Sequence, residues 1–291
     1  MAARDFMKLK SRLQEHYGPQ ALDGYARCIR TVFTWAYEAQ LIERMPLFGA
    51  DFKSHNVARA RRKAKRQDRK SGAGGAKMLP PETIVELMDA ASVPIRACML
   101  LGINCGFYAI DCSDLPIDAI NFTDRVIDFE RYKTGIDRIC PLWDETAEAL
   151  QAAISARPEP IDSAHTNRVF ITRRGNLWCG TRANTNEVGI LHSVTHADYL
   201  GQEFRRLFAK CTIPRPKGCG FSWLRHIFYS VARRSKNVDG VNAIMGHAAG
   251  GMTEFYLEEV ELDDIRSVTS HVHRWLFGAV PEGKHVLAKI G

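Results

Sequence analysis

Four polar side chains between residues 133 and 256 could do chemistry together: Lys133, Arg225, His247 and Tyr256. They offer an amine, a guanidinium, an imidazole and a phenol, which serve in proteins as proton donors, anion binders and nucleophiles. Each alone has an ordinary structural interpretation, because a turn lysine is usually solvated and a helical arginine is usually a surface charge. The order of the four residues and the intervals between the last three, 22 and 9 residues, carry the information.

The local sequence predicts which elements hold these residues. Apolar and polar residues alternate over 125–129 and again over 138–142, and Lys133 lies in the Gly-containing turn between them, which predicts a β-hairpin. Arg225 lies near the start of an apolar, helix-like stretch. His247 follows the dipeptide Met-Gly, and Tyr256 ends the stretch Met252-Thr-Glu-Phe-Tyr256.

In this order and at these spacings, the four residues resemble the catalytic domain of the tyrosine recombinase, or phage integrase, family. The resemblance spans residues 78–277, and its most specific part runs from Leu224-Arg-His through Gly246-His247 to Tyr256. It implies a mainly helical catalytic domain with a small antiparallel β-sheet. It also implies double-stranded DNA as the partner and assembly as a tetramer on paired DNA sites.

The reaction of this family is DNA strand transfer without a cofactor. A tyrosine hydroxyl attacks a DNA phosphate, which leaves a 3′-phosphotyrosyl link and a free 5′-hydroxyl, and a second strand reverses the step. The resemblance implies Tyr256 as the nucleophile, Lys133 as the general acid on the 5′ oxygen, Arg225 as the phosphate clamp and His247 as a hydrogen-bond donor to the phosphate. An arginine suits the clamp because its planar fork bonds two oxygens at once and stays charged.

Two positions depart from the family pattern. Tyr108 stands where the family has its first clamp arginine, in Gly106-Phe-Tyr108, and Ser222 stands where the HxxR motif has its histidine. Loss of one guanidinium from such a site should cost about 2–4 kcal/mol of transition-state stabilisation, or about 10²- to 10³-fold in rate. Arg96 and Arg131 are close enough in sequence to be conceivable replacements, or they are surface arginines in salt bridges.

The surplus of positive charge lies in one short segment. The sequence has 40 Lys and Arg against 33 Asp and Glu, and residues 59–70 hold eight cations against Asp68, which accounts for the whole net charge of +7. The eight cations are Arg59, Arg61, Arg62, Lys63, Lys65, Arg66, Arg69 and Lys70. We interpret them as contacts to DNA phosphates, with a solvated linker as the alternative.

The pattern predicts two domains and a linker. Residues 1–57 read as two helices, too few for a large core, and resemble part of the family's core-binding domain without its first helix. Residues 58–77 form a basic and Gly-rich linker, 78–277 the catalytic domain and 278–291 a C-terminal tail. The catalytic domain should contain helices near 80–91, 94–105, 145–156 and 262–277, a strand at 169–172, and mainly helix from Ala197 onward.

The composition is that of a folded globular protein, with 45% hydrophobic and 25% charged residues. No apolar run approaches the roughly 18 residues of a membrane span. The eight cysteines include no CxxC pair, and a lone HxH pair at His271 is a weak metal signal, so we expect structural thiols, no metal and no cofactor. We expect a cytoplasmic, nucleoid-associated protein of bacterial, phage or mobile-element origin.

Three hypotheses remain open. The first, which we favour because four roles occur in one chain, is a strand transferase whose second cation comes from elsewhere than position 108. The second is a catalytically impaired or inactive relative that acts as a DNA-binding protein, as Tyr108 and Ser222 suggest. The third is a helical RNA-binding or scaffolding protein, which explains the basic segment but not the order of the four polar residues.

Overall fold

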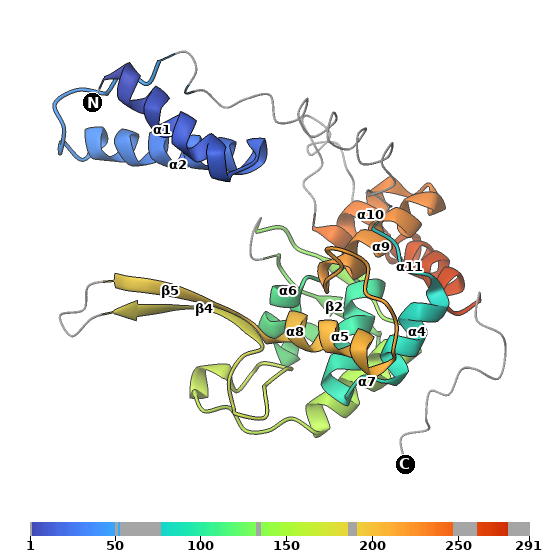
Figure 1. The fold of residues 1–291 in the computed structure, drawn as a ribbon. Coiled ribbons are helices and arrows are strands. Elements are labelled where there is room, and N and C mark those ends of the chain that lie inside the picture. Colours follow the sequence, from blue (N-terminus) through green and yellow to red (C-terminus); the bar gives the residue numbers. More distant parts are fainter. Residues whose placement is uncertain are drawn as a thin grey trace. The chain divides into compact units, whose positions relative to one another are not determined.

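The computed structural model describes residues 2–49, 52, 77–131, 135–185, 191–246 and 261–278, and for 19–20, 181–185 and 191–195 it describes the backbone alone. The chain divides into two compact units, Met1–Ala76 and Lys77–Gly291. Each unit is mainly helical, and two small antiparallel sheets lie in the second, as expected for the fold class (Figure 1). No helix among the described residues is long and apolar enough to cross a membrane.

The first unit contains helices α1 (Ala3–His16) and α2 (Pro19–Glu38). The Gly18-Pro19 pair separates them, because proline suits the first turn of the second helix. Their core is small: Phe6 is fully buried against Phe48 and Phe52, with ring centroids 4.6 and 5.1 Å away. Large side chains such as Trp35 remain exposed on α2, as the shortage of core residues predicts.

The second unit is built from eight helices in the described ranges. They are α4 (Pro81–Asp89), α5 (Val93–Asn104), α6 (Ala109–Asp114), α7 (Asp144–Ser155), α8 (Tyr199–Lys210), α9 (Ser222–Ala232), α10 (Val238–Met245) and α11 (Leu262–Phe277). From Ala97 to Ile103 helix α5 is apolar on every side, and it packs against α4, α7, α9 and α11, which makes it the centre of the core.

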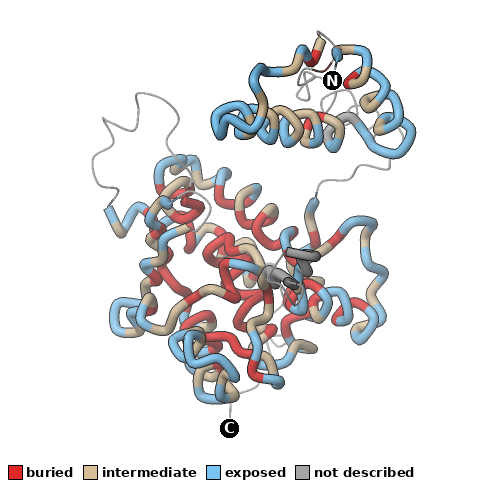
Figure 2. The backbone as a smooth tube through the Cα atoms, turned by 90° about the vertical axis from the view of Figure 1, so that its left-hand side faces the viewer, coloured by how far each residue is buried: buried red, intermediate tan, exposed pale blue. Residues whose placement is uncertain are grey.

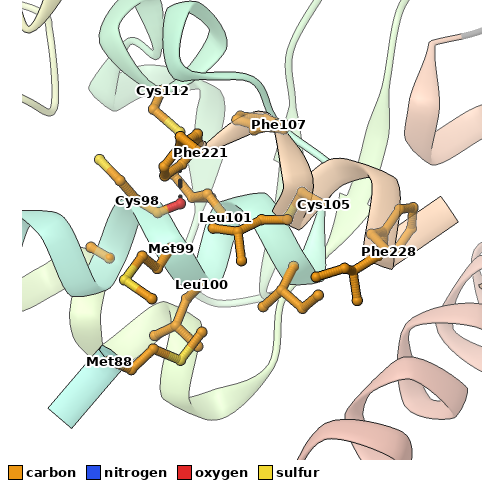
Figure 3. Packing of buried hydrophobic residues seen from close by; sticks show 14 of the residues in the cluster. Met88, Cys98, Met99, Leu100, Leu101, Cys105, Phe107, Cys112, Phe221 and Phe228 are labelled. Atoms are coloured by element: carbon orange, nitrogen blue, oxygen red, sulfur yellow. Dashed lines mark hydrogen bonds between the residues drawn. The ribbon is translucent and has the colours of Figure 1, made fainter. Parts of the chain in front are cut away.

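The core collects around this central helix. Figure 2 shows the buried residues of the second unit inside a shell of exposed ones. In Figure 3, Met99, Leu100 and Leu101 of α5 lie among Met88 of α4 and Phe228 of α9, and each of these side chains is at most 4% exposed. The positions of α9 and α10, which carry the polar residues described below, are therefore fixed by a continuous apolar core.

The hairpin predicted over 125–142 is present and gains a third strand. Strands β1 (Ile120–Asn121), β2 (Val126–Asp128) and β3 (Ile139–Pro141) form an antiparallel sheet in that order. Ile127 pairs with Cys140, and both are fully buried, so the alternation in sequence correctly indicates the inward face. The three turn residues 132–134 lie outside the described residues.

Two expectations about strands were wrong. The strand expected at Val169–Thr172 is reduced to one bridge, Ile171 to Leu177, because the chain reverses at Thr172–Asn176 and leaves no length to pair. The helix expected from Ala197 begins two residues later, at Tyr199, because Ala197 and Asp198 end a strand. Strand β4 (Cys179–Thr185) pairs with β5 (Leu191–Asp198) in a long hairpin that projects from the helices (Figure 1).

All eight cysteines are free thiols. Cys98, Cys105, Cys112, Cys140, Cys179 and Cys219 are buried. Burial raises the pKa of Cys179 to about 12 and that of Cys219 to about 11. These thiols act as small apolar residues of the core, as their sequence surroundings suggested.

Candidate functional site

The guanidinium of Arg225 is buried beneath the surface of the second unit. Arg225 lies on the first turn of α9 and is only 3% exposed. Its Nη1 donates to the carbonyl of Gly106 at 2.5 Å, and its Nη2 donates to the carbonyl of Met245 at 3.1 Å. The guanidinium thus joins the segment after α5 to the last residue of α10, and its orientation is fixed at both ends.

Close backbone packing makes the first of these bonds available. Gly106 has a φ of +64°, and a Cβ built on it would lie 2.8 Å from Sδ of Met245 and 2.9 Å from a ring carbon of Phe228. Any side chain there would separate the chain from α9 and α10. Glycine is therefore required for both its left-handed conformation and its close approach.

Tyr108 lies directly against Arg225. Tyr108 is the N-cap of the short helix α6, and its backbone N–H donates to Oδ2 of Asp111 at 2.7 Å. Cζ of Arg225 lies 4.6 Å from the centroid of the Tyr108 ring, within the range of a cation–π interaction. Position 108 thus faces the guanidinium of Arg225, with an aromatic ring instead of a second cation.

The carboxylate of Asp111, which accepts from the Tyr108 N–H, also lies beside a second buried arginine. Arg138, on the hairpin just before β3, is fully buried, and its Nη1 lies 3.4 Å from Oδ2 of Asp111. Its guanidinium carbon lies 4.4 and 5.1 Å from the ring centroids of Phe107 and Phe129, and its Nε donates to the carbonyl of Phe129 at 3.2 Å. This arginine supports the floor of the site and does not reach its surface.

A third arginine reaches the same place from the hairpin. Nη1 of Arg131 donates to the carbonyl of Gly246 at 3.1 Å, and the side chain is partly exposed. Met245 and Gly246 end α10, so Arg225 and Arg131 bond to consecutive carbonyls at the negative end of its dipole. Gly246 has a φ of +56°, and a Cβ built on it would meet Arg138 at 2.8 Å and Arg131 at 3.2 Å.

The electrostatics of Arg225 reflect this crowding. Burial is the largest cause that lowers the pKa of Arg225, and the nearby Arg131 and Arg138 act in the same direction. Tyr108 and Asp111 raise it. An arginine stays charged under any of these influences, so the described residues of this region place three guanidiniums around the carboxylate of Asp111. Such a region favours an anion.

Comparison with known proteins identifies the family. The model of the phage integrase family matches residues 77–261 of this chain. The chain belongs to the phage integrase family, which is the tyrosine recombinase family of the sequence analysis. No curated protein sequence matches the chain.

Two solved integrase structures show the fold this chain shares. The integrase of the Tn1549 transposon superposes with a TM-score of 0.55 at 17% identity, over 92% of this chain and 84% of that chain. A lambda integrase dimer bound to a COC′ core site gives a TM-score of 0.55 at 12% identity, over 90% of this chain and 68% of that chain. The arginine cluster is therefore set in a phage integrase fold.

Several residues matched to the integrase pattern lie outside the described part of the chain. These are Lys133, His247, Tyr256 and the eight cations of residues 59–70. The described cluster nevertheless borders them in sequence: Arg131 precedes Lys133 by two residues, and Gly246 immediately precedes His247. Their roles remain predictions.

Ser222, matched to the histidine of HxxR, is exposed on the first turn of α9, three residues before the buried Arg225. His226 lies beside Arg225 in sequence but points elsewhere, with Nε2 3.5 Å from Nζ of Lys77. Its pKa is lowered by burial and by the positive charges of Lys77 and Arg225. No described hydrogen bond or ring contact links Ser222 or His226 to the cluster.

The roles of Arg138 and Asp111 were missed in the sequence. A signal for Arg138 exists, because it alternates with Cys140 and Leu142 and so shares the inward face of the hairpin. Asp111 has a weaker signal as a carboxylate three residues after a helix N-cap. Within the described residues, no group of His, Cys, Asp or Glu could hold a metal ion.

Proposed function

We propose that this phage integrase is a site-specific DNA recombinase that cleaves and rejoins strands of double-stranded DNA. The hydroxyl of Tyr256 attacks a phosphate and loses its proton to solvent, the bond from phosphorus to the 5′ oxygen breaks, and a 3′-phosphotyrosyl link remains. Lys133 gives a proton to the leaving 5′ oxygen. Arg225 and His247 donate to the non-bridging oxygens, where negative charge grows in the transition state.

The guanidinium cluster carries this proposal. Arg225 is held rigidly by two backbone carbonyls, and the described residues that act on its charge include two guanidiniums, of Arg131 and Arg138, and the carboxylate of Asp111. A rigid donor needs no reorganisation when charge develops on a phosphate, and it is worth more in a site shielded from water. A purely structural arginine would gain nothing from two like charges beside it.

DNA as the partner is supported by the solved relatives. The Tn1549 integrase was solved in complex with circular intermediate DNA, and lambda integrase was solved as a dimer on a core site. In this chain the basic segment 59–70 supplies contacts to phosphates, which give affinity without reading sequence. Several copies assemble on paired sites, as a tetramer, when DNA is bound.

One observation favours a second candidate function. The ring of Tyr108 lies against Arg225 at the position matched to a clamp arginine, and a phenol ring cannot bond two phosphate oxygens as a guanidinium can. The chain would then bind recombination sites without cleaving them. Under this alternative, Tyr108→Arg together with Ser222→His creates an activity that the natural chain lacks.

A covalent-capture experiment tests the proposal. The full chain is incubated with a pool of nicked suicide duplexes whose bases around the nick are randomised, because the target sequence is unknown. Covalent complexes are collected under denaturing conditions, and their DNA is sequenced to find the selected duplex. We expect an adduct with the natural chain and none with Tyr256→Phe, which keeps the ring and removes the nucleophile.

The other outcomes decide between the two functions. An adduct that persists in Tyr256→Phe rules out this nucleophile. Tight binding without any adduct, combined with an adduct from the Tyr108→Arg, Ser222→His chain, establishes the impaired relative. Tight binding without an adduct from either chain contradicts strand transfer altogether.

A further inference from the structure

Arg131 is placed where a second cation could reach a phosphate held by Arg225. Its backbone closes the hairpin end, since Arg131 N–H bonds to the carbonyl of Ile136 and Gly135 N–H bonds to the carbonyl of Arg131, both at 2.8 Å. Its Nη1 bonds to the carbonyl of Gly246, the neighbour of the carbonyl that holds Arg225. The backbone of Arg131 is thus anchored in the hairpin, and its side chain is anchored at the end of α10.

Among the described residues, no carboxylate forms an ion pair with Arg131, whereas Arg138 lies beside Asp111. Arg131 is also partly exposed, and it lies close enough to Arg225 for its positive charge to lower the pKa of Arg225. Two guanidiniums near each other repel unless an anion lies between them, so this arrangement suits a ligand with several negative oxygens.

Arg96, the other arginine considered as the second cation, bonds to a different part of the fold. Nε of Arg96 donates to the carbonyl of Met88 at 2.9 Å, and its Nη2 donates to the carbonyl of Asp89 at 3.3 Å. These carbonyls lie at the C-terminal end of α4, where a cation stabilises the helix. Two of the three nitrogens of the Arg96 guanidinium thus bond to the end of α4, and no described contact links Arg96 to Arg225.

Position 108, where the family pattern has its first clamp arginine, is occupied by Tyr108. Cζ of Arg225 lies over the Tyr108 ring, which helps to hold the guanidinium in place, while the hydroxyl of Tyr108 offers a phosphate at most one hydrogen bond. Tyr108 is thus suited to orient Arg225. The missing cation must come from another element, and the hairpin provides one.

We propose that Arg131 is the second phosphate-binding guanidinium of this integrase, in place of an arginine at position 108. Arg225 and Arg131 together hold the two non-bridging oxygens of the DNA phosphate, and Tyr108 positions Arg225 through a cation–π contact. This inference rests on the proposed strand transfer for its rate effect. Its prediction of an anion site at the end of α10 stands without it.

The first test measures the rate of adduct formation on the selected duplex. Arg131→Gln removes the charge but keeps an amide that can donate to Gly246, so it separates phosphate binding from capping of α10. We expect a 10²- to 10³-fold slower rate in Arg131→Gln, a smaller loss in Arg131→Lys and no change in Arg96→Ala. An unchanged rate in Arg131→Gln, or an equal loss in Arg96→Ala, overturns the proposal.

The second test does not need strand transfer. Thermal unfolding of the full chain is compared in inorganic phosphate and in chloride at equal ionic strength. We expect phosphate to raise the melting temperature of the natural chain and of Arg96→Ala above the value in chloride, with a much smaller rise in Arg131→Gln. Equal stabilisation of Arg131→Gln, or none in the natural chain, refutes the anion site.

The two readouts separate the possible failures. If the natural chain forms no adduct but loses its phosphate response in Arg131→Gln, the proposed function fails and the anion site stands. If adducts form and Arg131→Gln keeps both its rate and its phosphate response, the chain is a recombinase whose second cation lies elsewhere. Far-ultraviolet circular dichroism of each variant checks that the fold is retained.

Discussion

Tyr108 lies with its ring against the guanidinium of Arg225, and the Cζ atom is 4.6 Å from the ring centroid. This contact shows that position 108 faces the phosphate-binding arginine proposed for this integrase. It also explains how the chain keeps Arg225 oriented without a neighbouring arginine on α6, since a ring face attracts a cation with about 0.5–2 kcal/mol. A substitution at 108 should therefore act directly on the cluster.

Adding Tyr108→Arg to the Arg131→Gln chain should restore activity. A guanidinium at 108 faces Arg225 and can replace the one removed from the hairpin. We expect the double variant to regain at least about 10-fold in the rate of adduct formation over Arg131→Gln alone. Tyr108→Phe in the same background keeps the ring and serves as the control. If both double variants are equally slow, position 108 cannot reach the phosphate.

Breaking the buried pair beneath the site should destabilise the fold. Asp111→Asn leaves the fully buried Arg138 charge without its carboxylate, which should lower the free energy of unfolding by about 3–5 kcal/mol. Asp144→Asn is the matched control, because Asp144 pairs with Arg125 on the exposed side of the hairpin. That surface pair should contribute at most about 1 kcal/mol.

Urea denaturation of both variants measures the difference. Adding Arg138→Met to Asp111→Asn should recover part of the loss, because the double variant buries no unpaired charge. Equal losses in Asp111→Asn and Asp144→Asn would mean that the carboxylate does not neutralise the buried guanidinium. Strictly additive losses in the double variant would lead to the same conclusion.

Gly246 should tolerate alanine less well than a glycine with a similar backbone. Both Gly246 and Gly218 have positive φ, +56° and +75°, but a Cβ at 218 meets no atom within 4 Å. Gly218→Ala should lose about 1–2 kcal/mol from backbone strain alone. Gly246→Ala should lose more, because its Cβ would collide with Arg138 and press on Arg131.

The Gly246→Ala and Gly218→Ala variants also test the position of Arg131 in the arginine cluster. Displacing Arg131 from the carbonyl of Gly246 should slow adduct formation in Gly246→Ala, whereas Gly218→Ala should keep the natural rate. Melting temperatures and adduct rates are measured side by side. A Gly246→Ala chain that matches Gly218→Ala in both would show that the arginines move aside without consequence.

Much of the fold could be predicted from the sequence because the order of apolar and polar residues within one element reflects which of its faces is buried. The all-apolar run of α5 and the alternation around Ile127 and Cys140 each reflect burial within one element. The hairpin of β4 and β5 was missed, because its strands contain Gly180, Ala183 and Asn184, residue types that disfavour strands, so pairing decides their conformation.

The arrangement of the site could not be read in the same way. The bond from Arg131 to Gly246 joins residues 115 positions apart, and the bond from Arg225 to Gly106 joins residues 119 apart. No local spacing encodes such contacts, so Arg131 and Arg96 looked equally able to replace the missing cation. The structure separates them through their partners: Arg131 bonds to the end of α10, and Arg96 bonds to the end of α4.

Neutralising the basic segment should weaken DNA binding without affecting the arginine cluster. Replacing the eight cations of residues 59–70 by glutamine removes contacts to phosphates, which carry no sequence information. If about five of them engage the duplex, the slope of log affinity against log salt should become less steep by about 4–5. Affinity should fall equally for the selected duplex and for a random one. The rise in melting temperature in inorganic phosphate, which depends on Arg131, should remain.

A scrambled segment is the matched control. Reordering residues 59–70 keeps every charge, so a segment that contacts only phosphates should bind both duplexes as the natural chain does. If scrambling weakens binding to the selected duplex alone, the segment reads bases and its order matters. If neutralisation leaves the salt slope unchanged, residues 59–70 do not touch the DNA, and the net charge of +7 reflects a solvated linker.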